Sequence, residues 1–287
     1  MLIGCWPPGL PIEAPAPGDL VSRLQAYMIK AIREAKRHTS WLTTNDEYES
    51  AMLAYVESTL RGPAAQKALA ALRPLLERVA RHGVTNSLAQ KVLELTAPGV
   101  PDTYQGAEDW VFHLVDPDNR QPVAFDRLAF RLAGIVRRRE APSFGPADVT
   151  DWLHHWEDGD IKRHVTSALL AARREAPDVW VHGAYHPADV ELAVDATAIA
   201  YARVAATGAW ALTLAGLRTA RLPAPWPVGP AWATSRVLLP EGAPGGVWRD
   251  LLSGVEIKTM ESSTERWFFL AQALQALPVA VLVPSAS

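Results

Sequence analysis

The chain has 287 residues, of which 49% are hydrophobic and 21% charged, so its composition is that of a globular protein and excludes disorder, collagen and coiled coil. The length predicts one large or two medium domains with a substantial core. The formal net charge of -3 is too close to neutral to favour nucleic acid or an anionic membrane surface as a partner.

The single cysteine and the apolar start bear on the compartment. Cys5 forbids any intrachain disulfide and leaves no cysteine cluster for zinc or iron–sulfur, which fits a reducing, cytoplasmic compartment. The segment Met1–Trp6 is apolar but lacks a basic flank, so we expect neither a leader nor a membrane span. Because this opening also lacks a capping residue, it suggests a piece cut from a longer chain.

The first hundred residues are predicted to be essentially all helical. Asp19 suits an N-cap, and Thr44 followed by Glu47 has the spacing of a capping box. Pro63 suits a first helical turn, whereas Pro74 should kink or split the helix that contains it. The predicted helices span about 19–38, 44–60, 63–83 and 86–95.

The pattern changes after residue 99. Val100–Gly106 is predicted to form a short strand that ends in a loop, and a turn-rich passage follows. Helices are expected at 126–139 and from Asp160 to Glu175. Beyond Val181, short apolar runs separated by Gly and Pro turns predict an antiparallel β domain.

Four strings of residues carry a resemblance to a known family. They are KAIREAKRHTSW at Lys30–Trp41, NSL at Asn86–Leu88, APGVPDTYQG at Ala97–Gly106 with Glu108, and LVDPDNR at Leu114–Arg120 with Pro122. In this order and spacing they resemble the maltooligosyl trehalose synthases, which belong to the α-amylase family of glycoside hydrolases. The resemblance is strong over roughly residues 1–130, and the remainder matches only in layout.

The resemblance implies a (β/α)8 barrel, of which this chain corresponds to the C-terminal third. We therefore expect an α+β, multidomain fold, with a helical region and the last β/α element of the barrel followed by a C-terminal antiparallel β-sandwich domain. The implied parts are 1–99, the helical insertion and seventh-helix region; 100–180, strand eight, the substrate loop and the final barrel helices; and 181–287, the β domain.

The resemblance also implies an activity and a deficit. The family converts the reducing-end α-1,4 link of a maltooligosaccharide into an α,α-1,1 link by intramolecular transglucosylation. Retaining transfer needs an ionised and a protonated carboxyl group about 5 Å apart. The family's three catalytic carboxyl residues precede the matched segment, and its strand-seven string Asp-Thr-Lys is absent from this sequence. We therefore expect no catalytic residue in this chain and no activity of the chain alone.

By analogy with the family, three groups of residues are expected to bind substrate, in the loop after the predicted strand, in the Pro-Asp-Asn turn and at the end of the first long helix. They are Tyr104, Gln105 and Glu108; Asp116, Asp118, Asn119 and Arg120; and Lys36, His38 and Trp41. Each group has a structural alternative. The first would be a turn that packs a tyrosine, the second a turn with a local Asp–Arg pair, and the third a cationic helix end beside a core tryptophan.

No cofactor and no metal are expected. His154, His155 and His164 lack the carboxylate–histidine spacing of a metal site and are expected to be solvated residues that flank helices. Most tryptophans, including Trp210 and Trp248, are expected to anchor cores or turns rather than to bind sugar.

The expected partners are a maltooligosaccharide substrate and the missing N-terminal barrel part, on the same or a separate chain. Self-association is the alternative, because strand eight near 100–103 would otherwise expose an unpaired edge. Two other functions stay open: a non-catalytic carbohydrate-binding or interaction module, and a purely structural remnant.

Overall fold

The computed structural model describes residues 1–11, 16–62, 64–223 and 225–285, and it divides into two compact units. Unit 1 comprises Met1–Ala80 and Val111–Val123, and unit 2 comprises Arg81–Trp110 and Ala124–Ser287. The division into 1–99, 100–180 and 181–287 stays a prediction, because contacts within this chain do not test the boundaries of a larger barrel. Pro63, expected in a first helical turn, lies outside the described residues.

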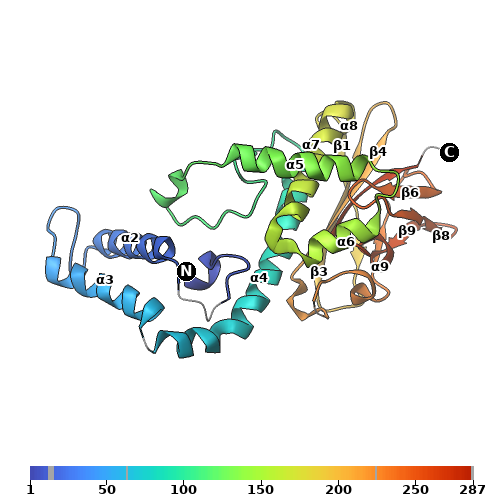
Figure 1. The fold of residues 1–287 in the computed structure, drawn as a ribbon. Coiled ribbons are helices and arrows are strands. Elements are labelled where there is room, and N and C mark those ends of the chain that lie inside the picture. The colour runs from blue at the N-terminus through green and yellow to red at the C-terminus, as the bar shows by residue number, and fades with distance from the viewer. Residues whose placement is uncertain (12–15, 63, 224, 286–287) are drawn as a thin grey trace. The chain divides into compact units, whose positions relative to one another are not determined.

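Unit 1 is built from helices (Figure 1). They are α1 (Leu2–Cys5), α2 (Gly18–Ala35), α3 (Asp46–Arg61), the first half of α4 (Ala65–Thr96) and the short 3-10 turn η1 (Asp118–Arg120). Their apolar faces share one core, in which Leu20, Leu60 and Leu69 are buried. Asn45 caps α3 by accepting a hydrogen bond from the backbone N–H of Tyr48 at 3.1 Å, one residue after the cap that the spacing indicated.

A single helix, α4, takes the place of the two helices predicted at 63–83 and 86–95. Pro74 lies inside it and is exposed, so water can bond the carbonyl that loses its backbone partner. Before Pro74, Leu69 packs into the core of unit 1, and after it Leu88, Val92 and Leu95 are buried in a core of unit 2. Packing at both ends of the helix therefore supports it across a residue whose intrinsic preference would end it.

Unit 2 begins with helices that pack against a sheet. They are the second half of α4, α5 (Phe125–Glu140), α6 (Pro146–His154), η2 (Trp156–Asp158), α7 (Asp160–Glu175) and α8 (Pro177–Trp180). Val92, Leu153 and Val165 share a buried core with one face of this sheet, while α5 packs on α7. Within the ranges that the structure describes, no helix is both long and apolar enough to cross a membrane.

The remainder of unit 2 forms two antiparallel sheets (Figure 1). The strands are β1 (Ala184–Pro187), β2 (Val190–Glu191), β3 (Thr197–Val204), β4 (Trp210–Leu217), β5 (Arg236–Leu238), β6 (Val247–Asp250), β7 (Glu256–Lys258), β8 (Met260–Glu261), β9 (Arg266–Phe269) and β10 (Val279–Pro284), with η3 (Thr219–Arg221), η4 (Gly229–Trp232) and α9 (Leu270–Ala273) between them. One sheet has the order β1-β3-β4-β10-β6-β7 and the other β2-β5-β9-β8. Helices with antiparallel sheets confirm the predicted α+β class in its coarse form.

The central strand β10 is buried on both faces. Val279 and Val281 join the core shared with the helices, whereas Ala280 and Leu282 join the core shared with the second sheet. Successive side chains point to opposite faces, so a strand between two cores is apolar at every position rather than at alternate ones. Trp248, also fully buried, is a core anchor as expected, while Trp210 is half-buried.

The strand predicted at Val100–Gly106 is wrong. This segment contains no strand, and no closed barrel forms among the described residues. A strand requires a neighbouring strand to take its backbone hydrogen bonds, and no other segment of the described chain pairs with this one. The segment instead ends in two consecutive turns, with hydrogen bonds from Ala107 N–H to the carbonyl of Tyr104 and from Asp109 N–H to that of Gly106.

Candidate functional site

A bend at the end of α2 is held by an ion pair with α3. The Arg33 guanidinium binds both carboxylate oxygens of Glu49, with Nε–Oε1 at 2.8 Å and Nη2–Oε2 at 2.6 Å. The Thr39 hydroxyl donates to the same carboxylate at 2.6 Å and accepts from the backbone N–H of Asn45. Arg33 first, and Thr39 second, lower the pKa of Glu49 to about 2.

Trp41 lies on this bend and is 55% exposed, so it is not a core residue. The Arg33 guanidinium carbon lies 5.0 Å from the centre of its ring, in a cation–π contact. The rest of the indole is open to solvent, as a surface for stacking a sugar ring must be. Lys36, with a left-handed backbone, and His38, whose ring packs 5.1 Å from that of Tyr48, are both exposed on the same bend.

The turn at 112–120, also in unit 1, is tied to α2. Asp118 receives two hydrogen bonds from Arg23, at 2.7 and 2.9 Å, and one from the backbone N–H of Leu114. The hydrogen bond from Arg23 is the main reason why the pKa of Asp118 is lowered. Lys30 donates to the carbonyl of Asp116 at 2.7 Å. Asp118 therefore closes the turn and has little capacity left for a ligand.

The other members of the turn are more available. Asp116 forms an ion pair with Arg120 at 2.5 Å, and both side chains are largely open to solvent, with exposed fractions of 48% and 75%. Asn119 is exposed as well. The structural alternative for this group, a turn with a local Asp–Arg pair, is thus present, and it leaves these exposed polar groups free to meet a sugar hydroxyl.

In unit 2 the loop of residues 103–110, here called the 103–110 loop, carries the group of Tyr104, Gln105 and Glu108. Tyr104 is 65% exposed and Gln105 is exposed beside it. Gly106 has a φ of 82°, a conformation that favours glycine, and it allows the two turns of the loop to follow one another directly. Glu108 is half-buried and lines a cavity.

The 103–110 loop is fastened to the first turn of α7. Arg163 donates to Asp109 Oδ2 at 2.6 Å, and Lys162 donates to the Asp109 carbonyl at 2.9 Å. The Lys162 ammonium also lies 5.2 Å from the ring centre of Trp110, whose indole N–H donates to the carbonyl of Trp156. Burial first, and the charge of Lys91 second, lower the pKa of Lys162 to about 8.

A cavity of about 400 Å³ lies beside this loop, between α5 and α7. Thr103, Glu108 and Arg163 give it a polar rim. Thr166 and Ser167 also line it, and its apolar wall is formed by Phe125, Leu128, Ala129, Leu132 and Leu170. Such a mixture of an apolar wall and a few polar groups is typical of a binding surface.

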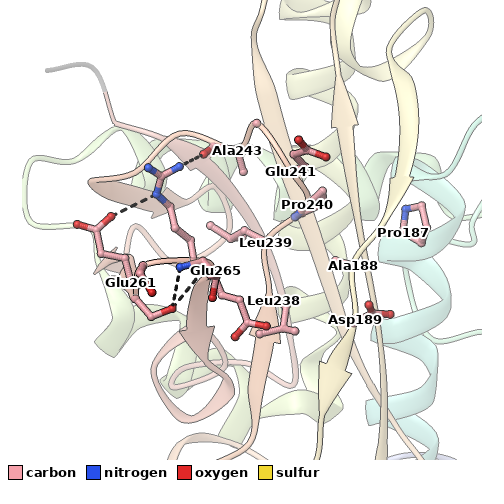
Figure 2. A pocket seen from close by; sticks show the side chains of 15 residues that line it. Pro187, Ala188, Asp189, Leu238, Leu239, Pro240, Glu241, Ala243, Glu261 and Glu265 are labelled. Carbon is pink, nitrogen blue, oxygen red and sulfur yellow. Dashed lines mark hydrogen bonds and ion pairs between the residues drawn. The ribbon is translucent and has the colours of Figure 1, made fainter.

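A second cavity, of about 630 Å³, opens between loops of the two sheets (Figure 2). Arg266 is among the residues that line it, and it donates to Glu261 at 3.3 Å and to the carbonyl of Ala243 at 2.9 Å. Asp189 and Glu241 line it from other loops, so its lining is rich in carboxylates. None of the residues predicted from the sequence lies here.

The histidines differ from expectation at one position. His164 is fully buried, not solvated, and its Nε2 lies 2.7 Å from the carbonyl of Leu252. Since Ile161 and Ala168 on the same helix face are also buried, helical periodicity places His164 in the core. In the described part of the chain no cluster of three or more His, Cys, Asp or Glu side chains is suited to hold a metal.

The candidate residues fall in both units of the chain. Two groups lie in unit 1, where both attach to α2, and the third lies in unit 2. Glu49, Asp118 and Asp109, whose side chains are 10%, 10% and 14% exposed, are each bound by an arginine. A retaining mechanism needs a free nucleophilic carboxylate and a protonated carboxyl partner.

Sequence reasoning missed the residues that support these groups. Arg23, Arg33, Glu49, Lys162 and Arg163 belong to helices, where a charged residue normally indicates a solvated face. Arg163 and Asp109 are 54 positions apart, and no local pattern joins them. The available signal was at Lys162 and Arg163, which put two cations in a first helical turn, where the helix dipole disfavours them.

No protein-family model matches the chain. Among curated proteins, one assigned as maltooligosyl trehalose synthase in Mycobacterium tuberculosis (strain H37Rv) is 34% identical over 186 residues, which is 65% of this chain and 20% of that protein. The same match is found in the strain CDC 1551.

Solved structures give a longer match. Maltooligosyltrehalose synthase from Arthrobacter ramosus covers 99% of this chain with 30% identity and a TM-score of 0.71. A second crystal structure of a maltooligosyl trehalose synthase covers 98% with 26% identity and a TM-score of 0.68. The chain spans only 31% and 32% of those proteins, and about a fifth of the curated relatives.

Proposed function

We propose that this chain, a homologue of part of maltooligosyl trehalose synthase, supplies walls of the substrate pocket and a supporting β domain, and is inactive by itself. The observation that carries the proposal is the match of 99% of this chain to 31% of a solved synthase. The whole enzyme's reaction would convert the reducing-end α-1,4 link of a maltooligosaccharide into an α,α-1,1 link by intramolecular transglucosylation.

The proposed division of labour follows from the chemistry. A carboxylate of the remaining part would attack the anomeric carbon, while a carboxylic acid protonates the leaving oxygen. The glucosyl–enzyme ester would then be opened by the 1-hydroxyl of the released terminal glucose, whose proton returns to the carboxylate base. The pocket must therefore hold that glucose and turn it, and this chain would contribute to doing so.

Two surfaces support a sugar-binding role. In unit 1 the Trp41 indole is open over most of its surface and backed by Arg33, so a glucosyl ring can stack on it. In unit 2 the exposed Tyr104 and Gln105 offer an aromatic ring and an amide on a loop that is fixed from behind. The exposed Asp116, Asn119 and Arg120 would add hydrogen bonds to sugar hydroxyls.

The apolar surface of unit 2 supports the proposal that the missing barrel part is a partner. The exposed apolar side chains of this unit include Val100 (94%), Phe130 (76%), Phe125 (55%), Leu170 (41%) and Leu132 (37%). Three of them line the cavity between α5 and α7. Exposed apolar clusters of this kind typically mark an interaction site. A second copy of this chain is the competing occupant.

The experiment is an assay on maltopentaose. We expect no trehalose-ended product from the purified chain, and product when the polypeptide corresponding to the preceding two thirds is added or fused. Product from the chain alone would overturn the proposal. Size-exclusion chromatography of the mixture should show a complex, and a dimer of this chain that excludes the other part would favour self-association.

A non-catalytic carbohydrate-binding module is the second candidate, and the carboxylate-rich cavity between the sheets favours it (Figure 2). Carboxylates and hydroxyls are good hydrogen-bond partners for sugars. Titration of the isolated chain with maltopentaose separates the two functions. Binding that survives Trp41→Ala and Tyr104→Ala but is lost in Glu241→Ala would favour the module.

A further inference from the structure

The first turn of α7 holds two cations that are almost completely buried. Lys162 is 9% exposed and Arg163 is 3% exposed. Both burial and the positive end of the helix dipole disfavour a cation at this place. Residues that oppose stability in this way are found where a local arrangement has another role.

Both cations bind a single residue of the 103–110 loop. Arg163 reaches the carboxylate of Asp109 at 2.6 Å, and Lys162 reaches its backbone carbonyl at 2.9 Å. The other carboxylate oxygen of Asp109 accepts from the backbone N–H of Trp110 at 2.7 Å. Side chain and backbone of Asp109 are thus held together, which fixes the direction of the chain as well as its position.

Gly159, immediately before α7, is shaped for the same contact. Its φ of 76° favours glycine, and a Cβ atom built there would lie 2.2 Å from Asp109 Oδ1. Any larger residue would push the loop away from the helix. The loop anchor therefore has four members, which are Asp109, Gly159, Lys162 and Arg163.

We propose that the loop anchor positions Tyr104, Gln105 and Glu108 against the terminal glucose during its reorientation, an inference that rests on the proposed function. Within the described chain, residues 103–110 have no strand neighbour, and the contacts of Asp109 with α7 hold the loop in place. Asp109 is a positioning residue, since it acts through the loop it holds.

The chemistry provides a readout that a purely structural role would not move. The glucosyl–enzyme ester can be opened by the 1-hydroxyl of glucose, giving a trehalose-ended product, or by water, giving a shortened maltooligosaccharide and free glucose. A loop that holds the glucose poorly lets water compete. The ratio of free glucose to trehalose-ended product therefore reports on the loop, independently of the amount of folded enzyme.

The test compares Asp109→Asn with the matched control Asp148→Asn. Asp148, on α6, is also bound by an arginine and a backbone N–H, and its side chain is 16% exposed against 14% for Asp109. In this chain, Asp109→Asn should speed hydrogen exchange of residues 103–110 about tenfold, as expected for loss of a charged hydrogen bond. Asp148→Asn should leave that exchange unchanged.

The same pair is then assayed with the preceding two thirds of the enzyme added and maltopentaose as substrate. Asp109→Asn should raise the ratio of free glucose to trehalose-ended product about tenfold, and Asp148→Asn should not change it. Faster exchange with an unchanged product ratio would overturn the positioning role. An unchanged exchange rate would overturn the anchor itself.

Lys162 variants provide a second measurement if Asp109→Asn folds poorly. Lys162→Arg keeps a cation over Trp110 and a donor for the Asp109 carbonyl, so its ratio of free glucose to trehalose-ended product should stay close to that of the unmodified chain. Lys162→Met should raise this ratio. Equal ratios for the two would count against the inference. If the unmodified assembly yields no trehalose-ended product, the proposed function fails and the positioning role with it, while the exchange data still report whether the anchor holds the loop.

Discussion

Asp118 in unit 1 and Asp109 in unit 2 each tie a non-helical segment to a helix through an arginine, and the two arginines differ in depth. The Arg23 side chain is 21% exposed, whereas that of Arg163 is 3% exposed. A buried ion must be fully paired, since removal of its partner leaves an uncompensated charge. A more exposed ion that loses its partner can be solvated by water instead. Removal of the arginine from each Asp–Arg pair should therefore lower the free energy of unfolding by different amounts in the two units.

Arg163→Met should have the largest effect on this comparison. It removes the hydrogen bonds from Arg163 to Asp109, Asp160 and the Asp158 carbonyl. Asp109 then keeps its ion pair with Arg127 at 3.3 Å, and Asp160 keeps its ion pair with Arg131 at 2.9 Å. We expect a loss of about 3 kcal/mol in the free energy of unfolding, measured by urea denaturation followed by circular dichroism. A loss below about 1 kcal/mol would show that the Arg163–Asp109 pair contributes no more than a surface ion pair does.

Lowering the pH should destabilise unit 2, because His164 is buried there. Burial lowers the pKa of His164 to about 4 from 6.5, so the unfolded chain takes up a proton before the folded one does. Stability should fall as the pH drops from about 6.5 towards 4, by up to about 3 kcal/mol. His164→Gln should flatten this dependence in urea unfolding at several pH values.

A comparison of Gly159→Ala with Gly208→Ala separates the cost of an unfavourable backbone conformation from the cost of a steric clash with Asp109. Gly159 and Gly208 both have positive φ, at 76° and 86°, but only the former would place a Cβ against another residue. Gly208→Ala should cost about 1 kcal/mol for the backbone conformation alone, and Gly159→Ala about 2 kcal/mol or more. Thermal unfolding of the two variants checks this difference. Equal losses would mean that Asp109 adjusts without cost.

Arg23→Met should have the smallest effect. Asp118 keeps its hydrogen bond from Leu114 N–H, and water can replace part of the lost arginine. We expect a loss of about 1 kcal/mol, measured by the same urea denaturation. A loss as large as that of Arg163→Met would show that depth does not govern these pairs.

The sequence predicts those helices and strands that depend on residues close together along the chain. Helical periodicity over 19–38 and 44–60, and short apolar runs beyond Val181, correspond to observed helices and strands, because each depends on neighbours within a few residues or in an adjacent hairpin. The strand at Val100–Gly106 could not be judged in this way, since its formation depends on pairing partners that no local pattern contains.

The candidate site follows the same rule. Exposed residues such as Trp41 and Tyr104 belong to continuous strings and were identified directly. Their supports were not, since Arg33 and Glu49 lie 16 positions apart and Arg163 and Asp109 lie 54 apart. Long-range ion pairs leave no periodic trace in a single sequence. His164 is an intermediate case, because the period of α7 already put it on the buried face.

The place of β10 has a consequence for how the β domain is completed. This strand follows all the others along the chain yet pairs between β4 and β6, in the middle of its sheet. During synthesis, Val279–Pro284 must therefore leave the ribosome before the sheet can be completed. Until then, β4 and β6 each have an unpaired edge that only β10 can cover. A stop codon just upstream of Val279 would split one sheet into two rather than shorten it.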